Sequence, residues 1–403
     1  MSDFYQNGVI TTLHQLGNPS LDRLETELYR YSKTRPVALV LPALYSEFEG
    51  PAMPGIVREL AKVKYLNEIV LVLDKGTEKN FQSVREFMSP ISTDVRIIHN
   101  DGKRISEIYE TFARNGFNVG ERGKGRSAWL AYGYVLARGK SEVIALHDCD
   151  IVTYSRELLA RLCYPVVHPT LNYVFCKGYY SRISSKMNGR VTRLLVTPLT
   201  RVLQQLIEPH DFLAFLDSFR YPLSGEFCMH TDLARVNRIP WDWGLEVGSL
   251  AEVHRNYSPR RVCQVDIAAN YEHKHQMLSP DDAAKGLMKM VVDICKSIFR
   301  TLASEGVIFS DGLFKSLLVA YLRQAEDTIV KYEADAAING LGFDRHEEAM
   351  AVEAFTKAIA LAAQAFMENP MGTTPLIPNW NRVSTAIPDI FEMLKMAVDE
   401  DNK

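Results

Sequence analysis

The sequence has few of the features that mark secreted, membrane-spanning or nucleic-acid-binding proteins. Its six cysteines form no C-x-x-C pair, which argues against a zinc site and a disulfide framework and fits a reducing compartment. No uninterrupted apolar run is long enough to span a bilayer, and the first residues lack the basic start and apolar centre of a secretory signal. The 46 basic and 49 acidic residues leave a net charge of −3, so no basic field would recruit nucleic acid or an anionic membrane. We therefore expect a cytoplasmic protein with no nucleic-acid and no membrane partner.

The sequence does contain an alternation of apolar and amphipathic segments from residue 36 to about residue 150. Four short runs are apolar on both faces, as the strands of a helix-covered parallel sheet require, at residues 37–41, 68–73, 95–98 and 142–146. Segments of helical length and composition separate these runs, at residues 54–65, 78–88 and 127–137. This alternation predicts an open α/β sheet, with a ligand site beyond the carboxyl ends of its strands.

The second half of the chain changes from mixed to helical character. A further strand is expected at residues 173–176, followed by loops rich in glycine, arginine and aromatic residues. Ser279 and Pro280 form a helix start signal, after which apolar residues recur at helical spacing. Two more helices are expected over residues 312–337 and 344–368. The apolar stripes of these helices predict helix–helix packing. Because the stripes are more numerous than one packed layer needs, we also expect a homodimer.

Two carboxylates, Asp148 and Asp150, follow the fourth apolar run. In an extended segment alternate side chains share one side, so both can face one crevice while Cys149 turns away. Mg2+ prefers carboxylates in combination with phosphate oxygens. A D-x-D motif at the end of a buried strand is typical of glycosyltransferases that use nucleotide sugars, although acidic pairs also close many strands as solvated turns.

Lys124 lies between two glycines, directly before the helix expected at residues 127–137. Glycines permit close backbone approach, and a helix N-terminus offers free N–H groups to an anion. The segment is not a Walker A loop, because residue 118 is asparagine where that motif needs glycine. Lys124 therefore indicates a contact with a nucleotide or its diphosphate, with a flexible turn as the alternative.

Several segments occur in the order found in one enzyme family, at residues 41–47, 72–77, 123–125, 148–150, 189–192, 222–226, 243–248 and 271–273. Over residues 35–280 the chain resembles the glucosyl-3-phosphoglycerate synthases and their mannosyl-3-phosphoglycerate synthase relatives, which are retaining glycosyltransferases of the GT-A fold. The resemblance implies an α/β fold with a Rossmann-like GT-A domain, a mixed acceptor-binding region and an α-helical C-terminal extension. We accordingly divide the chain into an N-terminal helical segment (1–35), a nucleotide-sugar-binding GT-A subdomain (36–170), an acceptor-binding subdomain (171–280) and a helical C-terminal region (281–403).

The resemblance implies roles for individual residues on the donor side. Asp150 is expected to bind Mg2+ or Mn2+, with His273 as a second metal ligand and His275 as the alternative to it. Asp150 and Glu246 are the expected catalytic residues, and Glu246 is also expected to hydrogen-bond the donor sugar. The nucleotide sugar is expected to contact Pro42, Ala43, Leu44, Glu47, Asp74, Lys124, Asp148 and Cys149.

The expected acceptor residues are Gly189, Arg190, Thr192 and His275. An arginine fork binds phosphate or carboxylate in bidentate fashion, and the Thr192 hydroxyl adds a donor. The sequence departs from the family pattern at Lys75, where a serine is usual, and at His275, where an asparagine is expected.

These residues predict transfer of a hexose from a nucleoside-diphosphate sugar to the 2-hydroxyl of 3-phosphoglycerate, in glucosylglycerate or mannosylglycerate compatible-solute synthesis. UDP-glucose is the favoured donor, and GDP-glucose and GDP-mannose are the alternatives. Free glycerate or another small acceptor, and a non-catalytic nucleotide-sugar-binding protein, are the competing interpretations. A sugar-nucleotide pyrophosphorylase is disfavoured, because residues 42–45 replace the Gly-rich loop that such enzymes need after the first strand.

Overall fold

The computed structural model describes residues 5–17, 20–272, 286–372 and 376–403. Within these ranges, eight strands form one sheet in the order β1-β8-β6-β7-β5-β2-β3-β4. The strands are β1 (Thr11–Leu13), β2 (Val37–Leu44), β3 (Leu66–Asp74), β4 (Asp94–His99), β5 (Val143–Leu146), β6 (Phe175–Tyr180), β7 (Phe227–His230) and β8 (Val262–Ala268). Only β7 runs antiparallel to its neighbours β5 and β6.

The structure confirms the α/β fold and the predicted strands β2 to β6. It also shows that the sheet continues across residue 170, since β6, β7 and β8 join the strands of the predicted GT-A subdomain. The expected N-terminal helical segment, residues 1–35, contains α1 and also the short strand β1, which pairs in parallel with β8 at one sheet edge. A three-residue edge strand is too short to produce a periodic signal in the sequence.

The helices begin and end as follows: α1 (Leu21–Tyr31), α2 (Ala52–Leu60), α3 (Glu78–Met88), α4 (Lys103–Arg114), α5 (Lys124–Arg138), α6 (Arg156–Val167), α7 (Thr197–Leu206), α8 (Asp211–Asp217), α9 (Thr231–Val236), α10 (Leu245–Asn256), α11 (Gly286–Ser304), α12 (Asp311–Ile338), α13 (Arg345–Glu368), α14 (Trp380–Ala386) and α15 (Ile390–Asp401). The predicted start of α11 at Ser279 lies outside the described residues. A π-helical turn, η2 (Val191–Val196), precedes α7, and a short turn, η1 (Tyr45–Glu47), follows β2.

Two apolar cores lie on the two faces of the sheet. Alternate residues of β2 point to opposite faces: Leu39 and Leu41 pack with α2, α3 and α6, whereas Val40 packs with α5. The second face continues into the C-terminal helices, which share its core. Burial on both faces explains why the central strands are continuously apolar.

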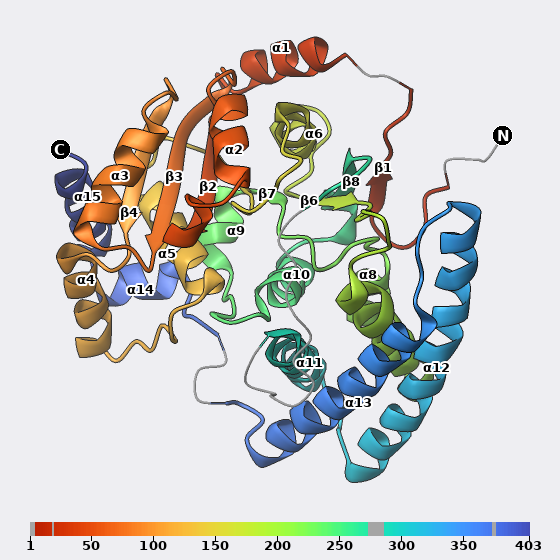
Figure 1. The fold of residues 1–403 in the computed structure, drawn as a ribbon. Coiled ribbons are helices and arrows are strands. Elements are labelled where there is room, and N and C mark those ends of the chain that lie inside the picture. Colours follow the sequence, from red (N-terminus) through yellow and green to blue (C-terminus); the bar gives the residue numbers. More distant parts are fainter. Residues whose placement is uncertain (1–4, 18–19, 273–285, 373–375) are drawn as a thin grey trace.

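The C-terminal helices occupy two opposite sides of the molecule (Figure 1). The long helices α12 and α13 contact each other, and α13 also contacts α11. Helix α13 is long and apolar enough to cross a membrane by length and composition alone, but half of the qualifying window is buried inside the protein. The chain then returns past the sheet, where α15 lies beside α5 and β4, and α14 contacts α9 and α15 (Figure 1).

A tryptophan pair joins α14 to α5. The rings of Trp380 and Trp129 are stacked with their centroids 4.2 Å apart, and both side chains are fully buried. Each indole N–H donates to a carbonyl of the opposite segment, Trp380 Nε1 to Trp129 O at 3.0 Å and Trp129 Nε1 to Pro378 O at 2.9 Å. A Cβ at Gly133 would lie 2.0 Å from the Trp380 ring, so this packing requires glycine in α5.

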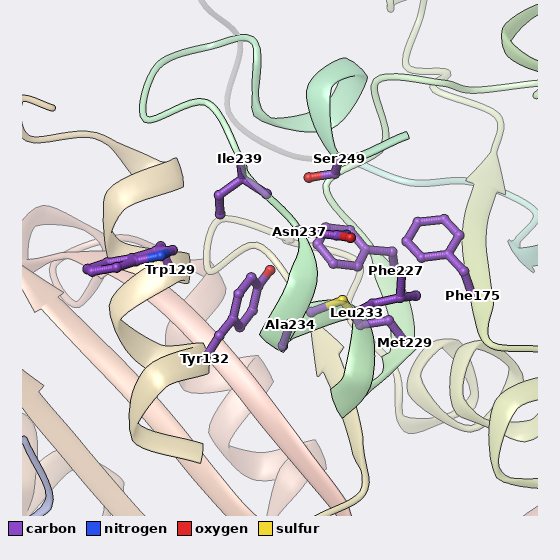
Figure 2. A pocket seen from close by; sticks show the side chains of 10 residues that line it. All are labelled: Trp129, Tyr132, Phe175, Phe227, Met229, Leu233, Ala234, Asn237, Ile239 and Ser249. Atoms are coloured by element: carbon purple, nitrogen blue, oxygen red, sulfur yellow. The ribbon is translucent and has the colours of Figure 1, made fainter. Parts of the chain in front are cut away.

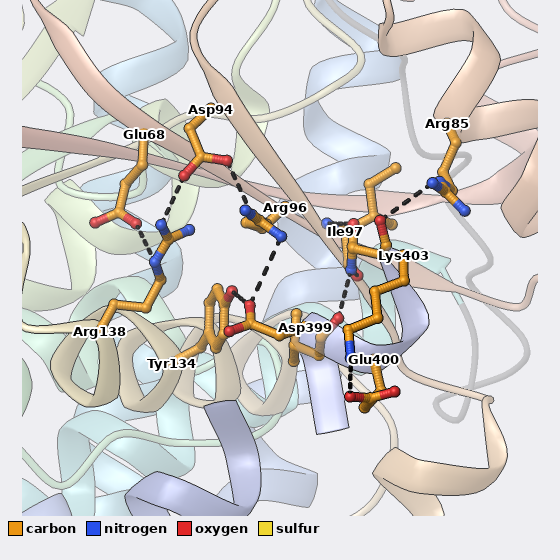
Figure 3. Close-up of polar contacts among 12 residues, drawn as sticks. Glu68, Arg85, Asp94, Arg96, Ile97, Tyr134, Arg138, Asp399, Glu400 and Lys403 are labelled. Atoms are coloured by element: carbon orange, nitrogen blue, oxygen red, sulfur yellow. Dashed lines mark hydrogen bonds and ion pairs between the residues drawn. The ribbon is translucent and has the colours of Figure 1, made fainter. Parts of the chain in front are cut away.

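Polar contacts fix the C-terminal end to the sheet edge. Asn402 Nδ2 donates to Ile97 O at 2.8 Å, and Ile97 N donates to Asn402 Oδ1 at 3.0 Å, so one amide side chain satisfies exposed backbone groups of edge strand β4. Figure 3 shows the adjoining contacts, in which Asp399 accepts from Tyr134 and pairs with Arg96. Helix α15 therefore covers an edge that would otherwise be open to pairing with another chain.

Candidate active site

The predicted donor residues lie at the edge of the sheet where β2, β3 and β5 end. Leu44 at the end of β2 is in register with Asp74 at the end of β3. On the other side, His147 N donates to Val40 O at 3.2 Å, which directs the D-x-D motif past the end of β2. Parallel strands thus bring residues far apart in sequence to one edge, as the strand-end prediction required.

The D-x-D motif alternates as the sequence predicted. Asp148 and Asp150 are partly exposed, whereas the Cys149 side chain is buried in the core. Burial raises the pKa of the Cys149 thiol well above its usual range, with the Asp148 and Asp150 carboxylates adding to the effect. A contact between Cys149 and a donor is therefore restricted to its backbone.

Lys124 holds two of the predicted carboxylates together. Its Nζ lies 2.5 Å from Asp148 Oδ1 and 3.1 Å from Glu246 Oε1. Burial by itself would lower the pKa of Lys124, but the Asp148 and Glu246 carboxylates outweigh that effect and raise it well above its usual range. The ammonium group is therefore permanently charged and links the N-terminus of α5 to the first turn of α10.

The glycines beside Lys124 lie against another segment of the protein. A Cβ at Gly125 would lie 2.0 Å from Pro240 O, and a Cβ at Gly123 would lie 2.4 Å from Trp241 O. These glycines therefore admit the backbone of residues 240–241, which leads into α10, and that approach brings Glu246 to Lys124. The structure gives them a packing role within the protein.

A second buried carboxylate, Glu226, lies behind Asp148. It accepts hydrogen bonds from the hydroxyls of Tyr180 and Tyr271. Burial and the nearby Asp148 carboxylate raise the pKa of Glu226. In the sequence, Glu226 belongs only to the matched segment 222–226, because nothing local shows that two tyrosines from other segments converge on it.

Gly225 allows the approach of this segment to the D-x-D motif. A Cβ there would lie 2.3 Å from Asp148 Oδ2 and 2.8 Å from Lys124 Nζ. The turn is supported by Lys177, a buried lysine in β6 whose Nζ donates to Ser224 O at 2.7 Å. Burial lowers the pKa of Lys177 to about 8.

Asp74 is held by other side chains of the protein. It accepts hydrogen bonds from Asn100 Nδ2 at 2.5 Å and from the Ser127 hydroxyl. Asn100 in turn accepts from Tyr109 at 2.6 Å. Both Asp74 oxygens therefore have protein partners, and the carboxylate is rigidly placed beside Leu44.

The remaining donor residues lie on β2 and the turn after it. Ala43 is buried, Leu44 is exposed, and Pro42 and Glu47 are intermediate. The Glu47 carboxylate is close enough to Cys149 to contribute to the raised pKa of its thiol, so η1 lies near the D-x-D motif. These side chains thus share one sheet edge with Asp148.

The loop carrying Asp150 is tied to the segment after β8. Val152 N donates to Glu272 O at 2.8 Å, and Glu272 N donates to the Thr153 hydroxyl at 3.0 Å. The predicted ligand His273 and its alternative His275 lie outside the described residues. Within the described ranges, no group of three His, Cys, Asp or Glu side chains is arranged to hold a metal ion. Asp150 and Asp148 do supply the carboxylate oxygens that a hard divalent cation prefers.

Stacked tyrosines connect the donor side to the predicted acceptor loop. The rings of Tyr180 and Tyr271 are parallel at 3.7 Å, and Tyr221 lies 4.9 Å from Tyr180 on centroids. Tyr221 accepts a hydrogen bond from Arg182 at 3.2 Å and would lie 3.5 Å from a Cβ at Gly189. A continuous series of contacts through these tyrosines therefore joins Glu226 to the predicted acceptor loop at Gly189.

Arg190 and Thr192 lie where that loop enters η2. Arg190 pairs with two glutamates of α13: its Nε lies 2.7 Å from Glu348 Oε1 and its Nη2 lies 2.7 Å from Glu347 Oε2. The Thr192 hydroxyl is buried and makes no hydrogen bond within the described part of the chain. Nothing in the sequence indicates that these glutamates contact Arg190, since more than 150 residues separate them from it.

Two cavities lie apart from these residues. Figure 2 shows the smaller one, of about 10 Å³, bounded by Tyr132, Asn237 and Ser249 among others. It has room for about one water-sized molecule and excludes a nucleotide sugar. The larger one, of about 600 Å³, is lined by residues of α10 and α11, including Arg300 and Asp293, and contains none of the predicted site residues.

Two curated proteins are similar to this chain over its whole length. No family model matches the sequence. A glucosyl-3-phosphoglycerate synthase of Persephonella marina is 52% identical over 402 residues, covering 100% of this chain and 99% of the relative. Another of that name, from Methanococcoides burtonii, is 39% identical over 406 residues, covering 100% and 98%. Both matches include the C-terminal helices, which the sequence resemblance over residues 35–280 left out.

A solved structure supports the fold. The Mycobacterium tuberculosis glucosyl-3-phosphoglycerate synthase in complex with Mn2+, UDP-glucose and phosphoglyceric acid has a TM-score of 0.52 and 18% sequence identity. The match covers 74% of this chain and 89% of that one. With the sheet-edge carboxylates, the central lysine and relatives matched over their full length, the chain belongs to the glucosyl-3-phosphoglycerate synthase family.

Proposed function

We propose that the protein transfers glucose from UDP-glucose to the 2-hydroxyl of 3-phosphoglycerate. The observation that carries the proposal is the cluster in which Lys124 joins Asp148 to Glu246, beside Asp150 at the carboxyl edge of the sheet. Family membership over the whole chain supports the reaction class. The names of both relatives favour glucose over mannose as the transferred sugar.

The chemistry asks for positive charge where the nucleoside diphosphate leaves. As the bond between the sugar and the diphosphate breaks, negative charge grows on the leaving oxygen, and a fixed cation stabilises that charge. Lys124 is held at this edge by Asp148, with its ammonium group charged. Asp150, with His273 or His275, would hold Mg2+ or Mn2+, which neutralises diphosphate charge when bound.

Glu246 is suited to the donor sugar. Lys124 holds one of its oxygens at 3.1 Å and so fixes the carboxylate in the first turn of α10. The carboxylate can then accept hydrogen bonds from sugar hydroxyls. We propose same-face displacement with retention, in which the leaving phosphate oxygen takes the proton of the acceptor hydroxyl. A glycosyl-enzyme trapped on Glu246 would contradict this mechanism.

The acceptor is assigned to the loop at Gly189, Arg190 and Thr192. Arginine binds a phosphate through parallel N–H groups, and a threonine hydroxyl supplies a further donor. The tyrosine stack from Glu226 to Gly189 supports this assignment, because it joins the loop to the donor side of the site.

The testing experiment is nucleoside diphosphate release by the purified protein with Mg2+ or Mn2+. UDP-glucose, GDP-glucose and GDP-mannose are each combined with 3-phosphoglycerate, glycerate or no acceptor. We expect release from UDP-glucose that requires 3-phosphoglycerate. Equal release of nucleoside diphosphate with glycerate as the acceptor would show that Arg190 and Thr192 do not bind an acceptor phosphate. Donor binding without release under any condition would favour the nucleotide-sugar-binding protein.

Three further expectations follow from this function. We propose a cytoplasmic enzyme that makes a precursor of a compatible solute and forms a homodimer. Light scattering during size-exclusion chromatography tests the last of these: a mass of about twice 45.6 kDa is expected.

A further inference from the structure

Two adjacent glutamates of α13 contact the arginine assigned to the acceptor. Glu348 and Glu347 each lie 2.7 Å from a different nitrogen of the Arg190 guanidinium. Both belong to the first turn of α13, where the helix dipole favours negative charge. The C-terminal region therefore reaches into the predicted acceptor site.

The two glutamates differ in burial and in their other partners. The Glu348 side chain is 5% exposed and also lies 2.9 Å from Arg193 Nη1. Arg193 donates from Nε to Asn188 O at 2.9 Å, which fixes the loop directly before Gly189. Glu348 thus holds Arg190 and the backbone of its loop in one arrangement.

Glu347 is placed on the solvent side of the same guanidinium. Its side chain is 45% exposed, and Lys186 Nζ lies 3.9 Å from it. It takes up Arg190 Nη2, a nitrogen that a phosphate bound end-on in bidentate fashion would use. A carboxylate there has the same charge sign as the acceptor phosphate and contacts the same donor.

We propose that Glu348 positions Arg190 for the phosphate of the acceptor, whereas Glu347 competes with that phosphate for the guanidinium. This inference rests on the proposed function, in which Arg190 binds the acceptor phosphate. The buried glutamate strengthens acceptor binding by orienting the arginine, and the exposed one weakens it by occupying a donor. Neighbouring residues of one helix turn therefore set acceptor affinity in opposite directions.

The test measures kcat, and KM for 3-phosphoglycerate and for UDP-glucose, in Glu347→Gln and Glu348→Gln. We expect Glu347→Gln to lower KM for 3-phosphoglycerate by about two- to fivefold, because an exposed ion pair of this kind is weak. We expect Glu348→Gln to raise it by about tenfold or more, because a buried partner is lost. KM for UDP-glucose stays unchanged in both. Glu353→Gln, exposed on the same helix, is the control and leaves both KM values unchanged.

Unchanged or raised KM for 3-phosphoglycerate in Glu347→Gln would overturn the competition, and unchanged KM in Glu348→Gln would overturn the positioning role. If Glu348→Gln does not fold, Glu348→Asp replaces it, because aspartate keeps the charge on a shorter side chain. We then expect a smaller increase in KM for 3-phosphoglycerate. Arg190→Lys separates this inference from the proposed function. If KM for 3-phosphoglycerate is unchanged in Arg190→Lys, Arg190 does not bind the acceptor phosphate. If that KM is raised in Arg190→Lys but is unaffected in Glu347→Gln, Arg190 keeps its assignment and only the competition by Glu347 is refuted.

Discussion

Lys124 and Asp148 form an ion pair at the centre of the candidate site, with Nζ 2.5 Å from Oδ1. The two residues come from different segments, the N-terminus of α5 and the end of β5. Because Glu246 pairs with the same ammonium group, one cation contacts carboxylates from two separate segments, and the three groups carry a net charge of −1. Removing that cation would leave Glu246 buried without its charge partner.

Lys124→Met is therefore expected to reduce both catalysis and stability. Leaving a buried carboxylate without its partner costs about 3–5 kcal/mol, and loss of a group that stabilises the transition state reduces kcat about 100-fold or more. Urea unfolding and steady-state kinetics measure the two effects. Lys140→Met, at an exposed position, serves as the control. Wild-type turnover in Lys124→Met would show that the ammonium group has no part in the reaction.

Asp150→Asn is expected to remove metal-dependent activity while the protein stays folded. Asp150 is partly exposed and supplies a carboxylate oxygen suited to Mg2+ or Mn2+, so its loss weakens metal binding more than packing. Titration calorimetry with Mn2+ in the presence of UDP should show affinity reduced about 100-fold or more. Asp22→Asn, exposed on α1, is the control. Unaltered Mn2+ affinity would exclude Asp150 as a ligand.

His147 predicts a loss of stability in mild acid. Burial lowers its pKa to about 3, and within the described residues neither ring nitrogen has a hydrogen-bond partner. The His147 ring is protonated near pH 6.5 in the unfolded state but only near pH 3 in the folded state. Stability is therefore fully present above pH 6.5 and is lost as the pH falls toward 3, by about 1.4 kcal/mol per pH unit.

The comparison of wild type with His147→Leu measures this contribution. Urea unfolding at pH 6.5 and pH 5.0 should show a wild-type loss that exceeds that of the variant by about 2 kcal/mol. Equal pH dependence in the two proteins would mean that folding does not lower the pKa of His147.

The contact between Trp380 and Trp129 predicts that the C-terminal helices stabilise the sheet domain. Trp380→Ala removes a fully buried ring and its hydrogen bond, and is expected to cost about 3–5 kcal/mol. Thermal unfolding compared with Trp243→Ala provides the control, because Trp243 is exposed. Similar melting temperatures for both variants would show that α14 contributes no stability to the rest of the protein.

The sequence could predict features that depend on neighbours along the chain. Strands β2 and β5 are continuously apolar because both of their faces are buried. Helix α3 spans residues 78–88, as its helical length and composition predicted. The alternation of Asp148, Cys149 and Asp150 follows from strand geometry alone. Order along the chain was also sufficient to indicate the family.

Other features required the tertiary structure, because they depend on residues that only folding brings together. The cysteines are scattered in sequence, yet Cys228, Cys176 and Cys263 lie side by side on β7, β6 and β8. The glycines beside Lys124 have local sequence features of a ligand loop, and only the structure shows that Gly125 also admits the distant Pro240. The partners of Arg190 are also invisible in sequence, since α13 begins more than 150 residues later.

Three features could be inferred from the order of the residues: the strand and helix pattern of the sheet domain, the carboxylate pair at a strand end, and the enzyme family. Each of these rests on side-chain periodicity or on order along the chain. The ion-pair partners, in contrast, are visible only in the folded protein: Lys124 pairs with Asp148 and Glu246, and Arg190 pairs with Glu347 and Glu348. Ion pairs form over a few ångströms in space, and the sequence contains no record of those distances.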